Sequence, residues 1–147
     1  MNRPKYETAI DLKNEREAIR SLERVSGRKA FKLPVSYRID FAMCNDDDEI
    51  TSWVEVKCRK NPYKQYPTLA IGITKLMAGI AFEQKTALPF FLVVHWPDYL
   101  GYIRISDLSK FKIIRGGRSD RNDNADEEPM VHIPIDQFKK LKTETER

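Results

Sequence analysis

The apolar residues near the start of the chain recur at helical spacing. They predict a helix over about residues 6–25, which Gly27 ends. On a wheel that advances roughly 100° per residue, Glu15 lies within about 80° of each apolar member, whereas Glu17 falls on the far side. The apolar members are Leu12, Ala18, Ile19, Leu22 and Val25. Because an uncompensated carboxylate in an apolar stripe is costly, we expect Glu15 to have a partner, either a metal ion or an arginine.

Alternation of apolar and polar residues next predicts two strands. The first covers residues 35–44, after a basic connection that contains Pro34, and the second covers 50–58. The acidic run between them, residues 45–49, is too polar to bury. Its short length favours an antiparallel hairpin.

A second helix and a buried strand are expected in the middle of the chain. Thr68 could cap a helix that runs to about Gln84 and is apolar nearly all round, which predicts a buried helix. The continuous run Phe90–Trp96 suits a central strand, with a neighbouring strand over 102–105.

The remainder of the chain is less regular. Residues 116–129 predict a mobile loop, 131–135 a short apolar segment, and 136–141 a helix. Taken in order, helix, strands, helix and strands predict an α/β layer fold.

Composition narrows the class of protein. The chain has 147 residues, a formal net charge of +4, 41% hydrophobic and 33% charged residues, which predicts one compact domain over 1–147 and excludes a disordered chain. No apolar stretch is long enough to cross a bilayer, and no secretory signal is present, so we expect a cytoplasmic protein. Cys44 and Cys58 are expected to be free thiols.

Positive charge is concentrated in two runs that contain no acid, between Glu23 and Asp40 and between Glu55 and Glu83. The basic residues are Arg24, Arg28, Lys29, Lys32, Arg38, Lys57, Arg59, Lys60, Lys64 and Lys75. A polyanion such as a nucleic acid would suit these runs, although a solvated basic face without a ligand would explain them too.

The second predicted strand contains the candidate chemistry. Glu55 and Lys57 are two positions apart, so their side chains emerge on the same face. Asp40 precedes Glu55 by fifteen positions, and a hairpin or its splayed end could bring the two carboxylates together. Two carboxylates and a lysine make a plausible Mg²⁺ site, in which Lys57 would orient or deprotonate an attacking water. The expected reaction is phosphodiester hydrolysis.

Two further features are open to a functional or a packing interpretation. Lys75, with Thr68, Gly72 and Gly79 on its face, could contact a phosphate or could snorkel at the edge of the core. The aromatic residues could stack on unpaired bases or simply pack together. They are Trp53, Tyr63, Tyr66, Trp96 and Tyr99.

The order of Glu15 on a helix, Asp40 on a strand and Glu55-Val56-Lys57 on the next strand resembles the PD-(D/E)XK nuclease superfamily, in particular its phage-type or Holliday-junction-resolvase-like members. The resemblance covers residues 10–105. Ile39 stands where the superfamily often has a proline before the aspartate. The resemblance implies a restriction-endonuclease-like αβββαβ core, in which helices flank a central mixed sheet.

The resemblance also implies site residues. Asp40, Glu55 and the backbone carbonyl of Val56 would hold Mg²⁺, for which Mn²⁺ would substitute, and Lys57 and Glu15 would complete the catalytic set. DNA contacts would come from Arg59, Lys60, Lys64, Gln65 and Lys75, with Tyr66 as an alternative to Gln65. The implied activity is that of a Mg²⁺-dependent deoxyribonuclease, a hydrolase and an endonuclease rather than an exonuclease, in a bacterium or a phage-infected cell. A homodimer remains open, and the alternative is a non-catalytic nucleic-acid-binding or phage assembly module that retains the fold.

Overall fold

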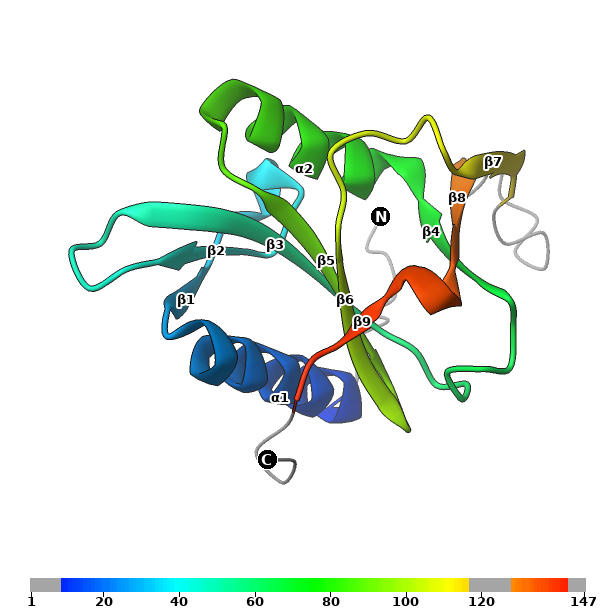
Figure 1. Ribbon diagram of the computed structural model, residues 1–147, viewed down its shortest axis with the longest axis horizontal. Coiled ribbons are helices and arrows are strands. Elements are labelled where there is room, and N and C mark those ends of the chain that lie inside the picture. Colours follow the sequence, from blue (N-terminus) through cyan, green and yellow to red (C-terminus); the bar gives the residue numbers. More distant parts are fainter. Residues whose placement is uncertain (1–8, 117–127, 143–147) are drawn as a thin grey trace, which may run out of the picture.

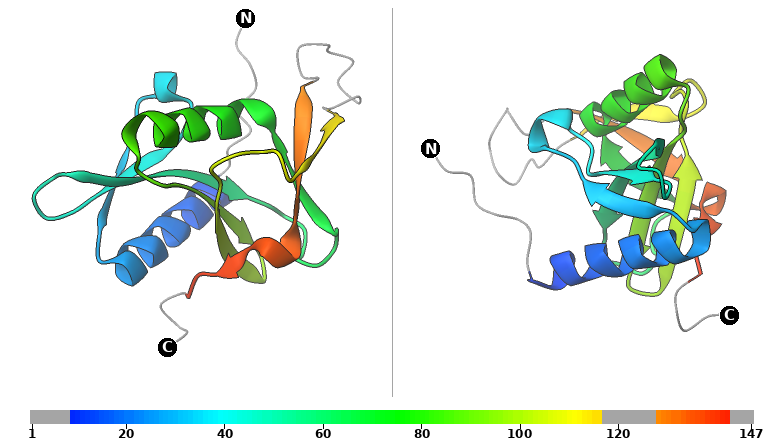
Figure 2. Two further views of the ribbon diagram at one scale, coloured as in Figure 1. Left: turned by 45° about the horizontal axis from the view of Figure 1, so that its top comes forward. Right: turned by 90° about the vertical axis from the view of Figure 1, so that its left-hand side faces the viewer.

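A mixed sheet lies between two helices in the computed structural model, which describes residues 9–116 and 128–142. Helix α1 (Ala9–Ser26) covers one face of the sheet and α2 (Ile73–Thr86) covers the other (Figure 1; Figure 2, right). The sheet has six strands in the order β1-β2-β3-β5-β6-β9. They are β1 (Lys29–Lys32), β2 (Phe41–Cys44), β3 (Ile50–Cys58), β5 (Phe90–Trp96), β6 (Tyr99–Arg104) and β9 (Lys139–Lys140). The expected α/β fold with helices on both faces is confirmed.

The centre of the sheet is a parallel pair. β3 and β5 run parallel in register from Trp53 opposite Phe90 to Cys58 opposite His95, and the other strand pairs are antiparallel. A parallel pair needs a crossover connection, which α2 supplies. The α2 side of the sheet buries Trp53, and the α1 side buries Val54, because successive side chains of β3 point to opposite faces.

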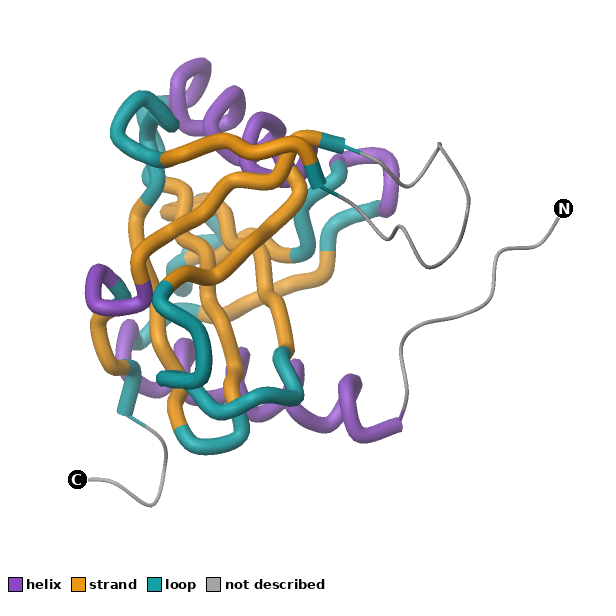
Figure 3. Tube along the Cα trace, turned by 90° about the vertical axis from the view of Figure 1, so that its right-hand side faces the viewer, coloured by secondary structure: helices purple, strands orange, loops and turns teal. Residues whose placement is uncertain are grey.

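A second, three-stranded antiparallel sheet was not predicted from the sequence. It contains β4 (Thr68–Gly72), β8 (Pro129–Pro134) and β7 (Lys112–Arg115), in the order β4-β8-β7. Figure 3 is seen from the side on which this sheet lies. Leu69 and Val131 pack into the core on the α2 side, so the small sheet is joined to that face.

The prediction of a helix from Thr68 is therefore wrong in its first turn. Residues Thr68–Gly72 form β4, and α2 begins at Ile73 after Gly72. The helix also buries one face rather than its whole circumference, since Met77 is 53% exposed. The expected shallow surface at Gly79 is filled, because the ring of Phe90 packs where a Cβ would stand.

Three other segments differ from the expectation. The strand predicted over 35–44 begins only at Phe41, after a 3-10 turn at Val35–Tyr37 and a left-handed Arg38 (φ 68°). The presumed connection before it contains β1. The helix predicted over 136–141 is a 3-10 turn, Ile135–Gln137, followed by β9. Most of the loop expected over 116–129 lies outside the described residues, as do residues 6–8 of the first helix.

Among residues 9–116 and 128–142, no helix is long and apolar enough to cross a membrane.

Candidate active site

The carboxylate of Asp40 is fixed where the β2–β3 hairpin opens. The two strands pair as far as Phe41 opposite Val54, and Asp40 lies one residue before β2. Its Oδ2 accepts a hydrogen bond from the Val56 backbone N–H at 3.0 Å. The side chain thus replaces a backbone acceptor beyond the end of the ladder, which holds the carboxylate beside β3. This is the splayed-end arrangement expected from the sequence.

Glu55 is buried, and Lys57 accompanies it on the same face of β3. The Glu55 side chain is 1% exposed, and the Lys57 Nζ lies 3.6 Å from its Oε2. Its other oxygen, Oε1, has no hydrogen-bond partner among the residues that the structure describes. The buried carboxylate of Glu83 differs, because its Oε1 accepts hydrogen bonds from the Phe90 N–H at 2.8 Å and the Arg104 Nε at 3.3 Å. Buried carboxylate oxygens normally have partners, so Glu55 is the exception that calls for a ligand.

The protonation of Glu55 depends on its burial and on the nearby Asp40. Burial, followed by the charge of Asp40, raises the pKa of Glu55 from its ordinary 4.5 to about 7. The cationic Lys57 and Lys75 oppose the rise. Near neutral pH a proton therefore partly occupies the pair, and a divalent cation would replace it.

The residues present fit a Mg²⁺ ion. That ion takes oxygen ligands, is commonly held by one or two carboxylates, and keeps water molecules or binds substrate phosphate. Asp40 and Glu55 supply two carboxylates, one with an unpartnered buried oxygen. The described part of the chain holds no group of three or more His, Cys, Asp or Glu side chains suited to a metal. A third protein ligand would thus be a backbone oxygen, for which the Val56 carbonyl stays a prediction.

Glu15 is linked to Asp40 by Lys32, a residue that the sequence did not mark as part of the site. The Lys32 Nζ lies 3.2 Å from the Glu15 Oε1 and 3.9 Å from the Asp40 Oδ1, and 4.8 Å from the centroid of the Phe41 ring. The salt-bridge partner of Glu15 is therefore a lysine and not the arginine that the sequence suggested as the alternative to a metal ion. The basic run was a signal for such a partner, but nothing local singled out Lys32 within it.

The position of Glu15 on its helix also needs correction. The buried face of α1 centres on Ala18 and Ser21, so Glu15 lies at one edge of that face rather than in its middle. Its side chain is 18% exposed, compared with 49% for Glu17, which lies 3.6 Å from the His95 Nε2. The two acids thus flank the buried face on opposite sides, and Glu15 is the one on the side of Asp40.

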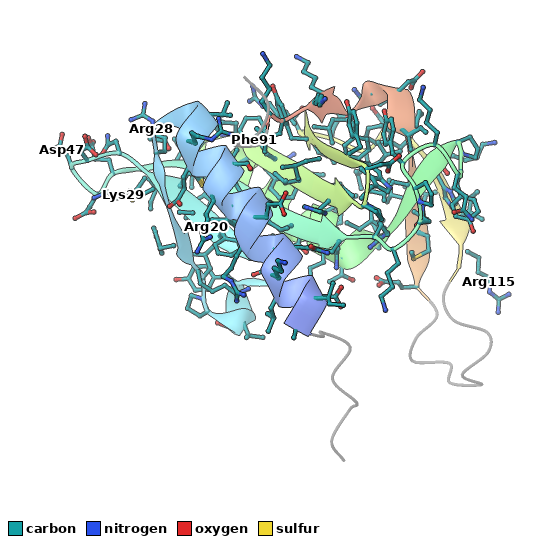
Figure 4. All side chains as sticks on the ribbon, turned by 90° about the horizontal axis from the view of Figure 1, so that it is seen from below. Arg20, Arg28, Lys29, Asp47, Phe91 and Arg115 are labelled. Carbon is teal, nitrogen blue, oxygen red and sulfur yellow. The ribbon has the colours of Figure 1, made fainter. Side chains whose placement is uncertain are left out.

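The basic residues of the first run separate in space. Lys32 lies at the carboxylates, whereas the Arg24 Nη2 donates a hydrogen bond to the Lys142 carbonyl at 2.6 Å. Arg28 and Lys29 lie where the end of α1 leads into β1 (Figure 4). In the second run, Lys57 and Lys75 lie close enough to Glu55 for their positive charges to lower its pKa.

The other predicted DNA-contacting residues lie around the segment from β3 to β4. The Arg59 guanidinium donates hydrogen bonds to the carbonyls of Cys58 and Ala70, at 3.3 and 2.9 Å. Lys60 and Lys64 are exposed. The Gln65 Nε2 donates to the hydroxyl of Tyr66 at 3.1 Å. Arg59 thus joins two chain segments, whereas Lys60, Lys64 and Gln65 are exposed at the surface, where a ligand could reach them.

Comparison with known proteins places this arrangement in a family. The family model described as "Phage putative PDDEXK endonuclease" matches residues 1–141. The fold is similar to that of Hjc, a Holliday junction resolvase from the archaeal hyperthermophile Archaeoglobus fulgidus, with a TM-score of 0.58 and 13% identity over 88% of this chain and 90% of that chain. No curated protein matches the chain. Since the family match spans both helices, the two carboxylates and the lysine, the chain belongs to the phage PD-(D/E)XK endonuclease family.

Proposed function

We propose that the protein is a Mg²⁺-dependent endonuclease that hydrolyses phosphodiester bonds in DNA, and that Mn²⁺ can substitute. The observation that carries the proposal is the buried Glu55 Oε1, which has no hydrogen-bond partner among the described residues although its carboxyl lies beside Lys57 and within the field of Asp40. Membership of a phage endonuclease family supports nuclease chemistry. The net charge of +4 supports a polyanionic substrate.

Asp40, Glu55 and the Val56 carbonyl would hold the ion. When bound, the ion would polarise the scissile phosphate and offset its charge. The Val56 N–H fixes one oxygen of Asp40, so the carboxylate is oriented before a ligand arrives. The burial of Glu55 keeps water away from its carboxylate, which strengthens its attraction for a cation.

Lysines would handle the substrate at this site. The Lys57 ammonium, beside Glu55, would orient the attacking water, accept its proton if it is itself deprotonated, and offset charge that develops on the phosphate. Lys75 would approach the same phosphate from α2, because its charge already reaches Glu55. Glu15 would act as a positioning residue that holds Lys32 against Asp40.

Arg59, Lys60, Lys64 and Gln65 would guide the DNA strand past the site. The fold neighbour is named as a Holliday junction resolvase, so branched DNA belongs among the substrates to be tested. We propose action in the cytoplasm of a bacterium or phage-infected cell, and a homodimer would allow both strands to be cut.

The test is cleavage of labelled linear, circular and branched DNA, and of RNA, with Mg²⁺, with Mn²⁺ or with a chelator. We expect DNA cleavage with either ion and none with the chelator, and conversion of circular DNA to a nicked or linear form because the enzyme cuts internally. Binding that falls steeply with salt but never yields product would instead show a non-catalytic nucleic-acid-binding module.

Replacing Glu15 by glutamine is expected to lower the rate of metal-dependent cleavage by about tenfold or more, as is usual when a residue that orients a metal ligand is lost. The physical reason is that Lys32 loses the carboxylate that holds it near Asp40. Glu17→Gln is the matched control, because it makes the same change on the same helix beside His95. Equal losses in the two variants would show that Glu15 does not act on the site.

A further inference from the structure

A hollow of about 380 Å³ opens where the end of β3 meets the small sheet. Its volume is in the range of small-molecule sites. The lining includes Arg59, Tyr63, Tyr66, Thr68, Trp96 and His132. The hollow therefore combines a cation, hydrogen-bonding groups and aromatic rings.

The hollow lies just beyond the end of β3, the strand that carries Glu55 and Lys57. The Arg59 N–H donates a hydrogen bond to the His95 carbonyl at 2.9 Å, so the parallel pairing of β3 with β5 continues beyond Cys58. The side chain of Arg59 therefore emerges on the same face as Lys57, roughly 7 Å further along the strand. A polynucleotide strand bound at Lys57 would reach the hollow within a nucleotide or two.

In the part of the chain that the structure describes, the guanidinium in this hollow has no acidic partner. Arg59 makes hydrogen bonds to two backbone carbonyls, and no carboxylate of residues 9–116 or 128–142 forms an ion pair with it. Burial lowers its pKa, which reflects the cost of holding this charge away from water. A guanidinium has five N–H donors and suits phosphate geometry, so an anionic ligand would complete its interactions.

Of the aromatic side chains that line the hollow, Tyr63 is packed against other rings and Tyr66 is exposed. The ring of Tyr63 stacks on Tyr99, with centroids 3.9 Å apart, meets Trp96 edge to face, and its hydroxyl donates to the Ile135 carbonyl at 2.6 Å. Tyr66 is 54% exposed, and its ring stacks on no other aromatic ring of residues 9–116 or 128–142. Thus Tyr66 keeps a ring face free for stacking.

Polar groups complete the floor of the hollow. The Thr68 Oγ1 and the His132 Nδ1 lie 3.0 Å apart, across the paired strands β4 and β8. Together they offer hydrogen-bonding capacity to the edge of a base. A base that is paired and stacked inside a duplex could present neither its face nor its pairing edge here, which restricts the ligand to an unpaired nucleotide.

We propose that this hollow binds one unpaired nucleotide of the DNA strand that runs past Glu55 and Lys57, with the base stacked on Tyr66 and a phosphate held by Arg59. The choice of DNA as the ligand rests on the proposed function. The hollow would direct the enzyme to DNA with a break, end or junction next to the scissile bond.

The test is equilibrium binding of the full-length protein to fluorescent oligothymidylate and to a blunt DNA duplex, with a chelator present so that no cleavage occurs. Stacking of a base on an aromatic side chain is worth enough that its loss weakens binding by roughly tenfold. We expect Tyr66→Ala to weaken oligothymidylate binding by about that factor and to leave duplex binding unchanged. Tyr66→Phe should bind like the unaltered protein, because the ring remains.

Tyr102→Ala is the control, since Tyr102 packs against the core on the α1 side of the sheet. It should bind both ligands normally, and thermal melting should verify that every variant is folded. If Tyr66→Ala binds oligothymidylate normally, or loses duplex binding equally, the proposed nucleotide site is wrong even when Lys57 is required for cleavage. If binding depends on Tyr66 but the protein cleaves no DNA under any metal condition, the nucleotide site stands and the proposed nuclease function fails.

Discussion

Replacing Lys57 by alanine is expected to slow Mg²⁺-dependent DNA cleavage by about a hundredfold or more, the usual range for a positioned acid–base group. Lys57 is the ammonium next to the buried Glu55, with 3.6 Å between its Nζ and the Glu55 Oε2. Its removal takes away the group that would orient the water and offset charge on the phosphate. Single-turnover rates at saturating protein measure the effect, because they report the chemical step apart from product release.

Lys85→Ala is the matched control for this prediction. Lys85 lies in the last turn of α2 and is exposed, so its replacement makes the same change in net charge and should leave the rate unaltered. DNA binding in the presence of a chelator should change little in Lys57→Ala. A cleavage rate that survives in this variant would mean that the activity comes from other residues or from a contaminating nuclease.

The geometry of Asp40, Glu55 and Lys57 could be predicted because local rules determine it. Alternation along β3 puts Glu55 and Lys57 on one face. The short acidic turn forces the two strands into an antiparallel hairpin, and the opening of that hairpin brings Asp40 to the Val56 N–H. Each step depends on residues within one supersecondary unit, so it can be read from the sequence.

Lys32 could not be predicted because β1 has almost no sequence signature. Its four residues, Lys29–Lys32, are exposed apart from a half-buried Ala30, so no apolar alternation marks a strand. Charged residues on an edge strand are common because they discourage pairing with other molecules. What defines β1 is its pairing with β2, including Lys32 opposite Phe41, and that pairing brings Lys32 next to Asp40.

The error at β4 has a related cause. Leu69 and Ile71 are buried and flank the half-buried Ala70, but so short an apolar run is compatible with the start of a helix as well as with a strand. The structure resolves the ambiguity through β8, a partner far along the chain. The hollow beside Tyr66 depends on this same pairing, so sequence reasoning could name the aromatic residues but could not separate the packed Tyr63 from the open Tyr66.

The second large effect concerns stability and pH in the absence of divalent metal. The pKa of Glu55 is raised by its burial and by Asp40 from 4.5 to about 7 in the folded protein. Between these two values the unfolded chain releases the proton of Glu55 while the folded chain keeps it, so the contribution of Glu55 to stability falls as pH rises from 4.5 to 7. Below 4.5 both states are protonated, and above 7 both are ionised, so the contribution is constant outside this window.

The free energy of unfolding of the unaltered protein is therefore expected to fall by about 3 kcal/mol relative to that of Glu55→Gln across this window. Urea unfolding with a chelator, at a series of pH values, measures the difference between the two curves. Glu49→Gln, in the exposed hairpin turn, should give a curve parallel to that of the unaltered protein. Added Mg²⁺ should raise the melting temperature of the unaltered protein more above pH 7 than below it, because the ion competes with the proton for Glu55. Parallel curves for the unaltered protein and Glu55→Gln would show that the pKa of Glu55 is not raised on folding, which would contradict its burial next to Asp40 and with it the proposed metal site.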